Sequence, residues 1–196
     1  MTKLTILRVL ILSVGVVLLL SIIAAILKND EQAKAVRAHI EELESPKANV
    51  RHRAAKALAE IGPASKEAVP HLIPLLKDDD PRVRAHSARA LGRIGAPANQ
   101  SIPDLIQLLS DAAPLVRKDA AVALGRFGPD AKDASGPLAR ALRDADVEVR
   151  RAAAAALGKI GREAKDAVGA LQYARQDSDQ RVRDAANYSL AKISKQ

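Results

Sequence analysis

The sequence predicts an all-α protein, a right-handed α-solenoid of about five helix pairs that follows one N-terminal transmembrane helix. Two observations predict this. No charged residue occurs from Val9 to Leu27. The dipeptide Val-Arg returns every 33 residues, at Val50-Arg51, Val83-Arg84, Val116-Arg117, Val149-Arg150 and Val182-Arg183. A fixed period of this length is typical of solenoids, in which stacked helix pairs bury a continuous core.

The N-terminal apolar segment predicts a membrane anchor. Residues 1–8 form a short tail, and residues 9–27 are Leu, Ile, Val and Ala apart from Ser13, Gly15 and Ser21. As a helix this segment spans roughly 28 Å, close to the thickness of the bilayer core. Because small residues let helix backbones approach closely, Ser13, Gly15 and Ser21 are the expected contacts with other membrane helices.

A cleaved signal peptide is the alternative for this segment. Its apolar region usually runs about 7–15 residues and ends in small residues in an A-x-A pattern at the cleavage site. Residues 21–27 lack that pattern, so the sequence favours a retained anchor. The basic residues are almost balanced across the segment, with Lys3 and Arg8 before it and Lys28, Lys34 and Arg37 after it. The short positive tail resembles a signal anchor, which favours repeats outside the cytoplasm.

Residues 28–45 are predicted to form a connecting and capping helix. Subtracting one period from the second unit places Ala35, Val36, Ile40 and Leu43 at apolar positions of a degraded first helix. The repeat domain then occupies residues 46–196. Counting the capping helix, the pairs are roughly 31–62, 63–95, 96–128, 129–161 and 162–196.

The second helix of each pair has clear start and stop signals. Pro81 and Pro114 lie where a first helical residue is expected, and Asp80, Asp146 and Asp179 are candidate N-caps. One apolar face, ended by Gly95, is formed by Val83, Ser87, Leu91 and Ile94. The first helix is expected over residues 68–76 in one pair and 102–109 in the next, with proline tolerated in its first turn.

The second-helix motif resembles a known repeat family. Asp78 and Arg84 precede the run Ser87-Ala88-Arg89-Ala90-Leu91-Gly92-Arg93-Ile94-Gly95, and Val149 to Gly161 repeats the pattern. This is similar to the short HEAT repeat of the phycobilisome-lyase type over about residues 46–193. The resemblance implies the fold, whereas the family includes bilin lyases, scaffolds and assembly factors and therefore does not fix an activity.

An Asp-Arg pattern predicts a charge ladder down the stack. In four units an aspartate stands six residues before the repeating arginine: Asp78 and Arg84, Asp111 and Arg117, Asp144 and Arg150, Asp177 and Arg183. Such a ladder would tie neighbouring units together and satisfy buried groups of the loops, as similar HEAT proteins imply. Ser45 replaces the aspartate in the first unit.

The variable positions of the second helices predict a binding face, because in HEAT-like stacks these helices line the concave surface. Positions three, six and ten after the repeating valine share one helix side. The expected partner-binding residues are Arg53, Lys56, His86, Arg89, Arg93, Val122, Arg126, Lys159, Tyr188 and Lys192. This face is basic near the anchored end and partly apolar farther along, which suits an acidic protein segment.

Other function classes find less support. The chain contains neither cysteine nor a His-Glu metal motif, phosphate loop or nucleophile elbow, so no catalytic residue, metal ligand or cofactor is expected. His52 and His86 lie 34 residues apart on adjacent second helices and could approach each other, but they are interpreted as exposed helix positions. The net charge of +8 allows nucleic acid as a partner, or attraction to anionic lipid, but only Phe127, Tyr173 and Tyr188 could stack on bases.

Together these observations predict a non-enzymatic, membrane-anchored scaffold. The expected partners are other protein subunits, with the chain as an accessory or stabilising subunit of a photosynthetic or respiratory membrane complex. The alternatives are a membrane-bound assembly factor, a bilin-lyase-like protein and a HEAT protein that binds nucleic acid. The glycosylation patterns at Asn99 and Asn187 are interpreted as chance matches.

Overall fold

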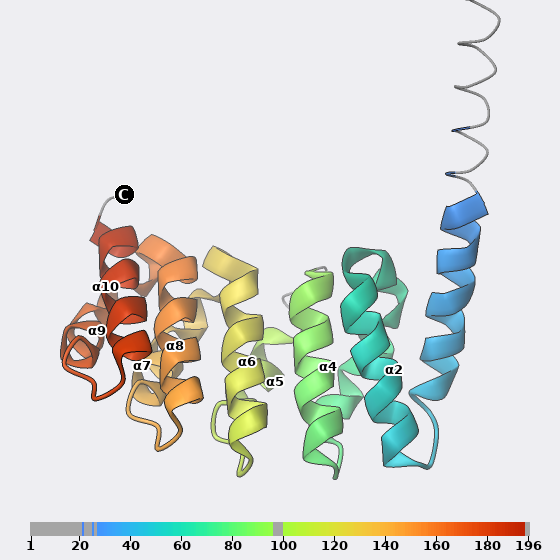
Figure 1. Cartoon of the computed structure of the whole chain (residues 1–196), viewed down its shortest axis with the longest axis horizontal. Helices are drawn as coiled ribbons and strands as arrows, with labels where there is room; N and C mark the ends of the chain where they lie inside the picture. The colour runs from blue at the N-terminus through green and yellow to red at the C-terminus, as the bar shows by residue number, and fades with distance from the viewer. Residues whose placement is uncertain (1–20, 22–24, 26, 96–99, 195–196) are drawn as a thin grey trace, which may run out of the picture.

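The computed structural model describes residues 21, 25, 27–95 and 100–194. A helix occupies residues 27–42, and helices stack in one row behind it (Figure 1). In order they are α2 Ala48–Ile61, η1 Gly62–Ala68, α3 Val69–Leu72, η2 Pro74–Lys77, α4 Pro81–Ile94, α5 Ile102–Leu108, α6 Pro114–Phe127, η4 Gly128–Ala134, α7 Ser135–Ala141, α8 Val147–Ile160, η5 Gly161–Ala167, α9 Val168–Ala174 and α10 Gln180–Ser194.

The predicted membrane span falls almost entirely outside these residues. Ser13 and Gly15 are not described, whereas Ser21 is helical and exposed. In the part of the chain that the structure describes, no helix has the length and apolar character needed to cross a bilayer.

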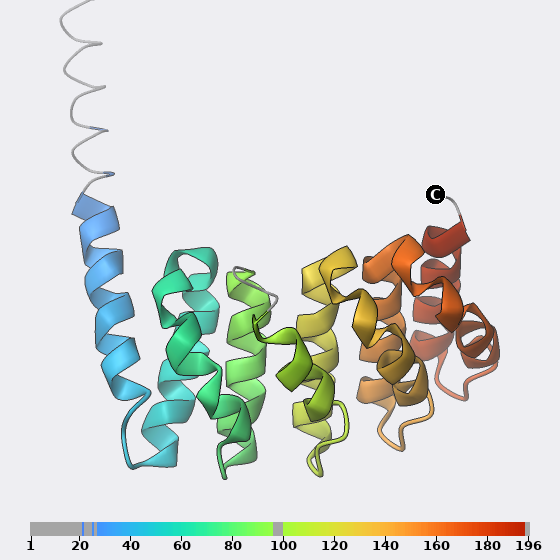
Figure 2. The same cartoon turned by 180° about the vertical axis from the view of Figure 1, so that it is seen from behind.

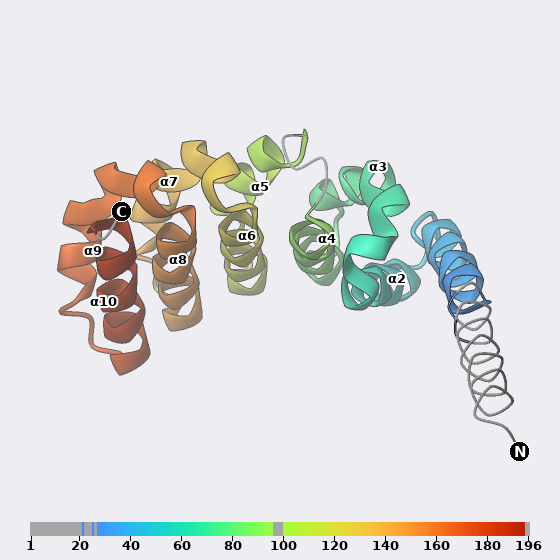
Figure 3. The same ribbon diagram turned by 90° about the horizontal axis from the view of Figure 1, so that it is seen from above.

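The repeats form two curved layers. The long helices α2, α4, α6, α8 and α10 line the inner side of the curve, and α3, α5, α7 and α9 lie on the outer side (Figure 3). Viewed from behind, the shorter outer helices cross in front of the inner ones (Figure 2). At the N-terminal end, Val36 and Leu43 of the first unit are buried against the core and Ile40 is half-buried, as their spacing predicted, whereas Ala35 is exposed. The all-α solenoid and its five helix pairs are therefore present in the described residues.

The inner helices begin and end where their sequence signals predict. The carboxylate of Asp80 accepts a hydrogen bond from the backbone N–H of Arg82 at 2.8 Å, and Asp146 and Asp179 cap α8 and α10 in the same way. Pro81 and Pro114 are the first residues of α4 and α6. Gly62 follows α2 with φ 71° and ψ −132°, a conformation that is essentially open only to glycine.

The outer helix of the second pair is shorter than the sequence indicated. The helix expected over residues 68–76 ends at Leu72, and a 3₁₀ turn begins at Pro74. Pro70 lies in the first turn, where its missing N–H has no intrahelical partner to lose. Pro74 lies one turn later, where a proline interrupts the hydrogen-bond ladder of an α-helix.

The core is a column of leucines surrounded by alanines. Leu58, Leu91, Leu124 and Leu157, one per unit, are each at most 2% exposed. The predicted apolar face of α4 is also buried, with Val83, Ser87 and Ile94 each at most 3% exposed. Because alanine carries little side-chain volume, the inner helices approach each other closely.

The closest approach between inner helices occurs at glycines. A Cβ atom placed on Gly125 of α6 would lie 2.8 Å from the Cα atom of Ala156 in α8, and one on Gly92 would lie 2.6 Å from the Cα atom of Ala123. Real Cβ atoms do not come this close to a backbone atom. Neighbouring inner helices therefore pack backbone to backbone, at the short end of the usual interaxial distance of about 8–10 Å.

We expect Gly125→Ala to destabilise the protein although alanine favours helix formation. Overpacking against Ala156 costs about 1–3 kcal/mol, whereas the gain in helix propensity is about 0.8–1 kcal/mol. Gly169 of α9 provides the matched control, because a Cβ there meets nothing within 4 Å. In urea titrations Gly125→Ala should lower the unfolding midpoint and Gly169→Ala should raise it. A higher midpoint for both variants would contradict the close helix contact.

Candidate binding surface

A ladder of arginine and aspartate side chains joins consecutive units along the loops that precede the inner helices. Arg84 donates from Nε to Asp111 at 2.7 Å and from Nη2 at 2.8 Å, while its Nη1 donates to the backbone carbonyl of Asp78 at 2.7 Å. The same arrangement pairs Arg51 with Asp78, Arg117 with Asp144 and Arg150 with Asp177. Arg84, Arg117 and Arg150 thus each bind the carbonyl of the aspartate six residues before them and the carboxylate of the next unit's aspartate.

The two ends of the ladder differ from its middle. At the first unit Arg51 donates to the backbone carbonyl of Ser45 at 2.9 Å, since no aspartate is present there. At the last unit Arg183 donates to the carbonyls of Asp177 and Ser178 and to the side chain of Gln180, in place of a following aspartate. The geometry assigns the ladder to joining the units, because its donors and acceptors are used within the fold.

The ladder lowers the pKa of its aspartates. Partial burial by itself would raise the pKa of Asp78, Asp111 and Asp144, but hydrogen bonds from arginine and from a backbone N–H outweigh it and bring each pKa below its ordinary value. For Asp177 the hydrogen bonds from Arg150 are the largest influence and lower the pKa in the same direction. The N-cap Asp80, bound by Arg82, has its pKa lowered to about 2.

These shifts predict acid sensitivity. A carboxylate whose folded pKa lies below its unfolded pKa contributes stability above the unfolded value, about 3.9, and loses it as the pH falls through the folded value. We therefore expect the free energy of unfolding to drop between about pH 4 and pH 2, near the folded pKa of Asp80. Urea titrations across this range provide the measurement. Asp144→Asn should show a shallower drop, and equal slopes would argue against the ladder as its source.

The predicted partner-binding residues lie on the inner helices, at the exposed side of the curve. Arg53, Lys56, Arg93, Arg126, Lys159, Tyr188 and Lys192 are exposed, and His86, Arg89 and Val122 are half-buried. We call the residues three, six and ten positions after the repeating valine of each of the five inner helices the concave face. Seven of its side chains are basic and two, Glu60 and Asp119, are acidic.

Arg89 has a structural partner that the sequence did not reveal. Its Nη2 atom lies 2.9 and 2.8 Å from the two carboxylate oxygens of Asp119, whose side chain is only 2% exposed. Lys118 lies 3.6 Å from the same carboxylate. Arg89 therefore neutralises a buried charge of the next unit, and its positive charge is less available to a partner than those of its neighbours.

Four basic residues form a row along the concave face. Arg93, Arg126, Lys159 and Lys192 occupy the same position in the last turns of α4, α6, α8 and α10, and we call them the cation row. In the described part of the chain, the side chains of Arg93, Arg126 and Lys159 make neither a hydrogen bond nor an ion pair. Lys192 lies over the ring of Tyr188, with its Nζ atom 5.5 Å from the ring centre. A cation at a helix C-terminus is stabilised by the helix dipole.

An amphipathic cleft of about 540 Å³ lies beside the cation row, between α8 and α10. The ring of Tyr188, 62% exposed, forms one wall. Small and basic residues also line it: Ala155, Gly158, Lys159, Ala185 and Lys192. The cleft therefore combines small apolar groups with two ammonium groups.

The structure also brings His52 and His86 together, as their positions on adjacent helices allowed, and both are half-buried where exposed positions were expected. Their rings meet edge to face with centroids 4.5 Å apart, across the α2–α4 contact. His86 donates from Nδ1 to the backbone carbonyl of Arg82 at 3.0 Å. Burial, followed by the neighbouring His86 and Arg82, lowers the pKa of His52. The one-period offset plus one residue was the sequence signal for this contact.

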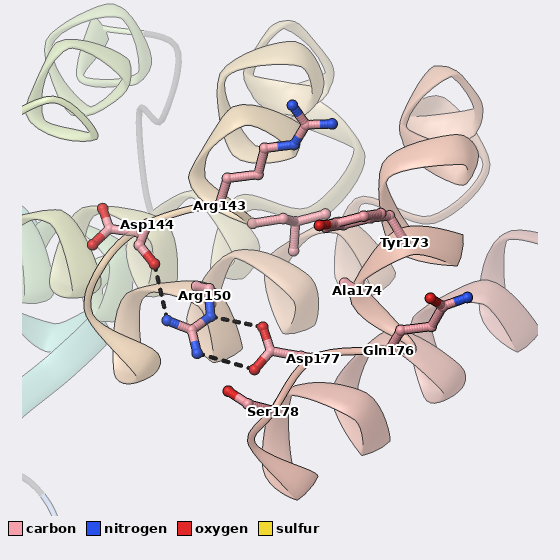
Figure 4. Close-up of a pocket in the computed structure, with 9 residues that line it drawn as sticks. Arg143, Asp144, Arg150, Tyr173, Ala174, Gln176, Asp177 and Ser178 are labelled. Atoms are coloured by element: carbon pink, nitrogen blue, oxygen red, sulfur yellow. Dashed lines mark hydrogen bonds and ion pairs between the residues drawn. The ribbon is translucent and has the colours of Figure 1, made fainter.

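A second cleft, of about 570 Å³, lies between the loops of the last two units and was not anticipated (Figure 4). Arg150 and Asp177 form one side of it, and both are committed to the ladder. On the other side Arg143 lies over the ring of Tyr173, 5.4 Å from its centre. The corresponding positions in the preceding unit are Ser110 and Arg140, so periodicity gave no signal for this pair.

Among the described residues, no group of three or more His, Asp or Glu side chains has the arrangement of a metal site. What the concave face offers is a row of charges and an apolar cleft on rigid helices. The row of charges is suited to acidic side chains, and the cleft is suited to an apolar side chain of the same partner.

Comparison with known proteins identifies the family of the repeat. A family model described as HEAT repeats matches residues 36–103 and 102–191. No curated protein matches the chain. Solved structures do match, and three of them illustrate the range.

The complex of CpcE and CpcF of phycocyanin lyase from Nostoc sp. PCC7120 is 26% identical, with a TM-score of 0.72 over 82% of this chain and 65% of that chain. An engineered protein is 28% identical, with a TM-score of 0.67 over 82% of this chain and 79% of that chain. A designed armadillo repeat protein in complex with the peptide (KR)4 is 22% identical, with a TM-score of 0.70 over 85% and 87% of the two chains. The last of these shows likeness of fold alone.

Proposed function

The chain belongs to the HEAT-repeat family, and we propose that it is a non-enzymatic scaffold that holds protein partners at a membrane. The cation row carries this proposal, because the exposed charges of Arg93, Arg126 and Lys159 have no partner among the described residues, whereas the arginines and aspartates of the ladder are used by the fold. A stack of rigid helices presents such a surface without ordering it on binding, which favours affinity.

We further propose that residues 9–27 anchor the scaffold and that it serves as an accessory subunit of a multi-subunit membrane complex, photosynthetic or respiratory. The apolar sequence of this segment supports the anchor. We also propose that the repeats lie outside the cytoplasm, which the short basic tail before the segment supports. Ser13, Gly15 and Ser21 would contact neighbouring membrane helices in such a complex.

Native-gel separation of membranes dissolved in mild detergent tests this proposal. We expect the protein to migrate with one large complex, whose other subunits mass spectrometry then identifies. The variant Val16→Arg/Leu20→Arg, which places two charges in the predicted span, should leave the membrane fraction and the complex. Migration near its own mass of 20.8 kDa would contradict an accessory-subunit role and favour a transient assembly factor.

A role like that of a phycocyanin lyase subunit is the second candidate. The likeness to the CpcE and CpcF complex, at 26% identity, supports it. An absorbance assay of bilin attachment to phycocyanin, with and without the purified protein, tests this role. Attachment that depends on the protein would replace the scaffold proposal, whereas unchanged absorbance would remove the second candidate.

A further inference from the structure

Building on the proposed scaffold function, we propose that the concave face binds an extended acidic segment of a partner protein that places one carboxylate against each of the inner helices α4, α6, α8 and α10. The cation row supplies the charge complementarity. Arg93, Arg126 and Lys159 are exposed cations without partners in the described residues. Each comes from a different helix at the same register, so the row crosses the helices instead of following one of them.

The spacing of the helices sets the spacing of the carboxylates. Gly92 and Gly125 bring neighbouring inner helices into backbone contact, which places them about 8–10 Å apart. Three residues of a polyproline II segment advance about 9 Å and return to the same side of the chain. An extended partner with an acidic residue at every third position would therefore present one carboxylate to each cation.

The cleft between α8 and α10 gives the segment an apolar anchor at one end. Tyr188 and the small residues Ala155 and Ala185 can cover an apolar side chain, while Lys159 and Lys192 at the rim bind the flanking carboxylates. Arg93 lies two helices away from this cleft, a distance of about 16–20 Å. An extended chain covers that distance in about five or six residues.

Charge and shape favour a peptide over nucleic acid on this face. Tyr188 and the half-buried His86, on different helices, are the aromatic rings among the concave-face positions, so successive bases would find no stacking platform. The carboxylate of Glu60 stands at the position of the cation row in α2, where a continuous phosphate backbone would meet repulsion. Separate carboxylates match cations that stand one to a helix, and apolar residues between them suit Ala155 and Ala185 beside Lys159 and Lys192.

Fluorescence anisotropy with the full-length protein in mild detergent tests the inference. The probe is a labelled twelve-residue peptide with aspartate at every third position and one terminal leucine. A peptide of the same composition with its aspartates clustered at one end is the control. We expect the periodic peptide to bind about tenfold more tightly, and equal affinities would overturn the spacing of one carboxylate per helix.

Two sets of variants locate the binding. The triple variant Arg93→Gln/Arg126→Gln/Lys159→Gln should weaken the periodic peptide by roughly tenfold or more, since each exposed ion pair contributes up to about fivefold. The triple variant Lys132→Gln/Arg140→Gln/Lys165→Gln removes the same charge from exposed positions outside the concave face and should change affinity little. Equal losses in both variants would overturn the concave site.

Tyr188→Ala and Tyr173→Ala form a second matched pair, because the two tyrosines are 62% and 65% exposed. Only Tyr188→Ala should weaken binding of the periodic peptide, because Tyr188 contacts its terminal leucine. If an oligonucleotide or anionic vesicles bind through the cation row and neither peptide does, the acidic-segment inference fails. If the native-gel complex survives in the first triple variant, the scaffold role stands and this site for the partner is wrong.

Discussion

Replacing Asp144 with alanine is expected to lower the free energy of unfolding by about 3–5 kcal/mol. The carboxylate accepts two hydrogen bonds from Arg117, both at 2.7 Å, and one from the backbone N–H of Asp146 at 2.8 Å. The Arg117 side chain is only 15% exposed, so the substitution leaves a largely buried guanidinium without its partner. Urea titration followed by circular dichroism measures the loss.

A double-mutant cycle separates the interaction from the cost of the stranded charge. The double variant Arg117→Ala/Asp144→Ala should cost less than the sum of the two single substitutions. Each single substitution leaves one charge without its partner, whereas the double variant removes both charges. Arg82→Ala is the surface control, since the side chain of Arg82 is 51% exposed. This substitution removes the ion pair with Asp80 but keeps the N-cap hydrogen bond, which the backbone N–H of residue 82 donates. We expect that control to lose at most about 1 kcal/mol. Additive single effects in the cycle would contradict the ladder as a coupled pair.

Most of the fold could be predicted from the sequence because the repeat encodes it several times. The 33-residue period, the aspartate N-caps and the glycines after the inner helices each recur, so local signals agree from unit to unit. Where a unit departs from the pattern, prediction was weaker. Pro74 shortened one outer helix because a second proline one turn after Pro70 breaks the hydrogen-bond ladder.

The binding surface was less predictable because its partners lie in neighbouring units. The sequence placed Asp78 and Arg84 in one unit, but the carboxylate of Asp78 binds Arg51 of the unit before, and only its carbonyl binds Arg84. Likewise, Arg89 and Asp119 are 30 residues apart, which is not a whole period, so no repeating column links them. Contacts across units follow from how the helices stack, and helical periodicity within one unit does not specify them.

Substitution of Leu124 by alanine tests how far each unit depends on its neighbours. Leu124 is fully buried in α6, the inner helix of the middle pair. Its truncation removes one methine and two methyl carbons from a site packed between two units, and leucine-to-alanine changes in cores cost about 2–5 kcal/mol. In a stack whose stability comes from contacts between adjacent units, a weak middle unit also uncouples the two ends.

We therefore expect the Leu124→Ala variant to unfold in urea at a lower midpoint and with a shallower slope, because the two halves of the stack no longer unfold together. Leu115→Ala is the matched control, since Leu115 lies on the same helix but is 37% exposed. That control should stay within about 0.5 kcal/mol of the unmodified protein. A lower midpoint with an unchanged slope would mean that the five units unfold as one block, in which the ladder and the backbone contacts at Gly92 and Gly125 couple the units more strongly than the loss at Leu124 separates them.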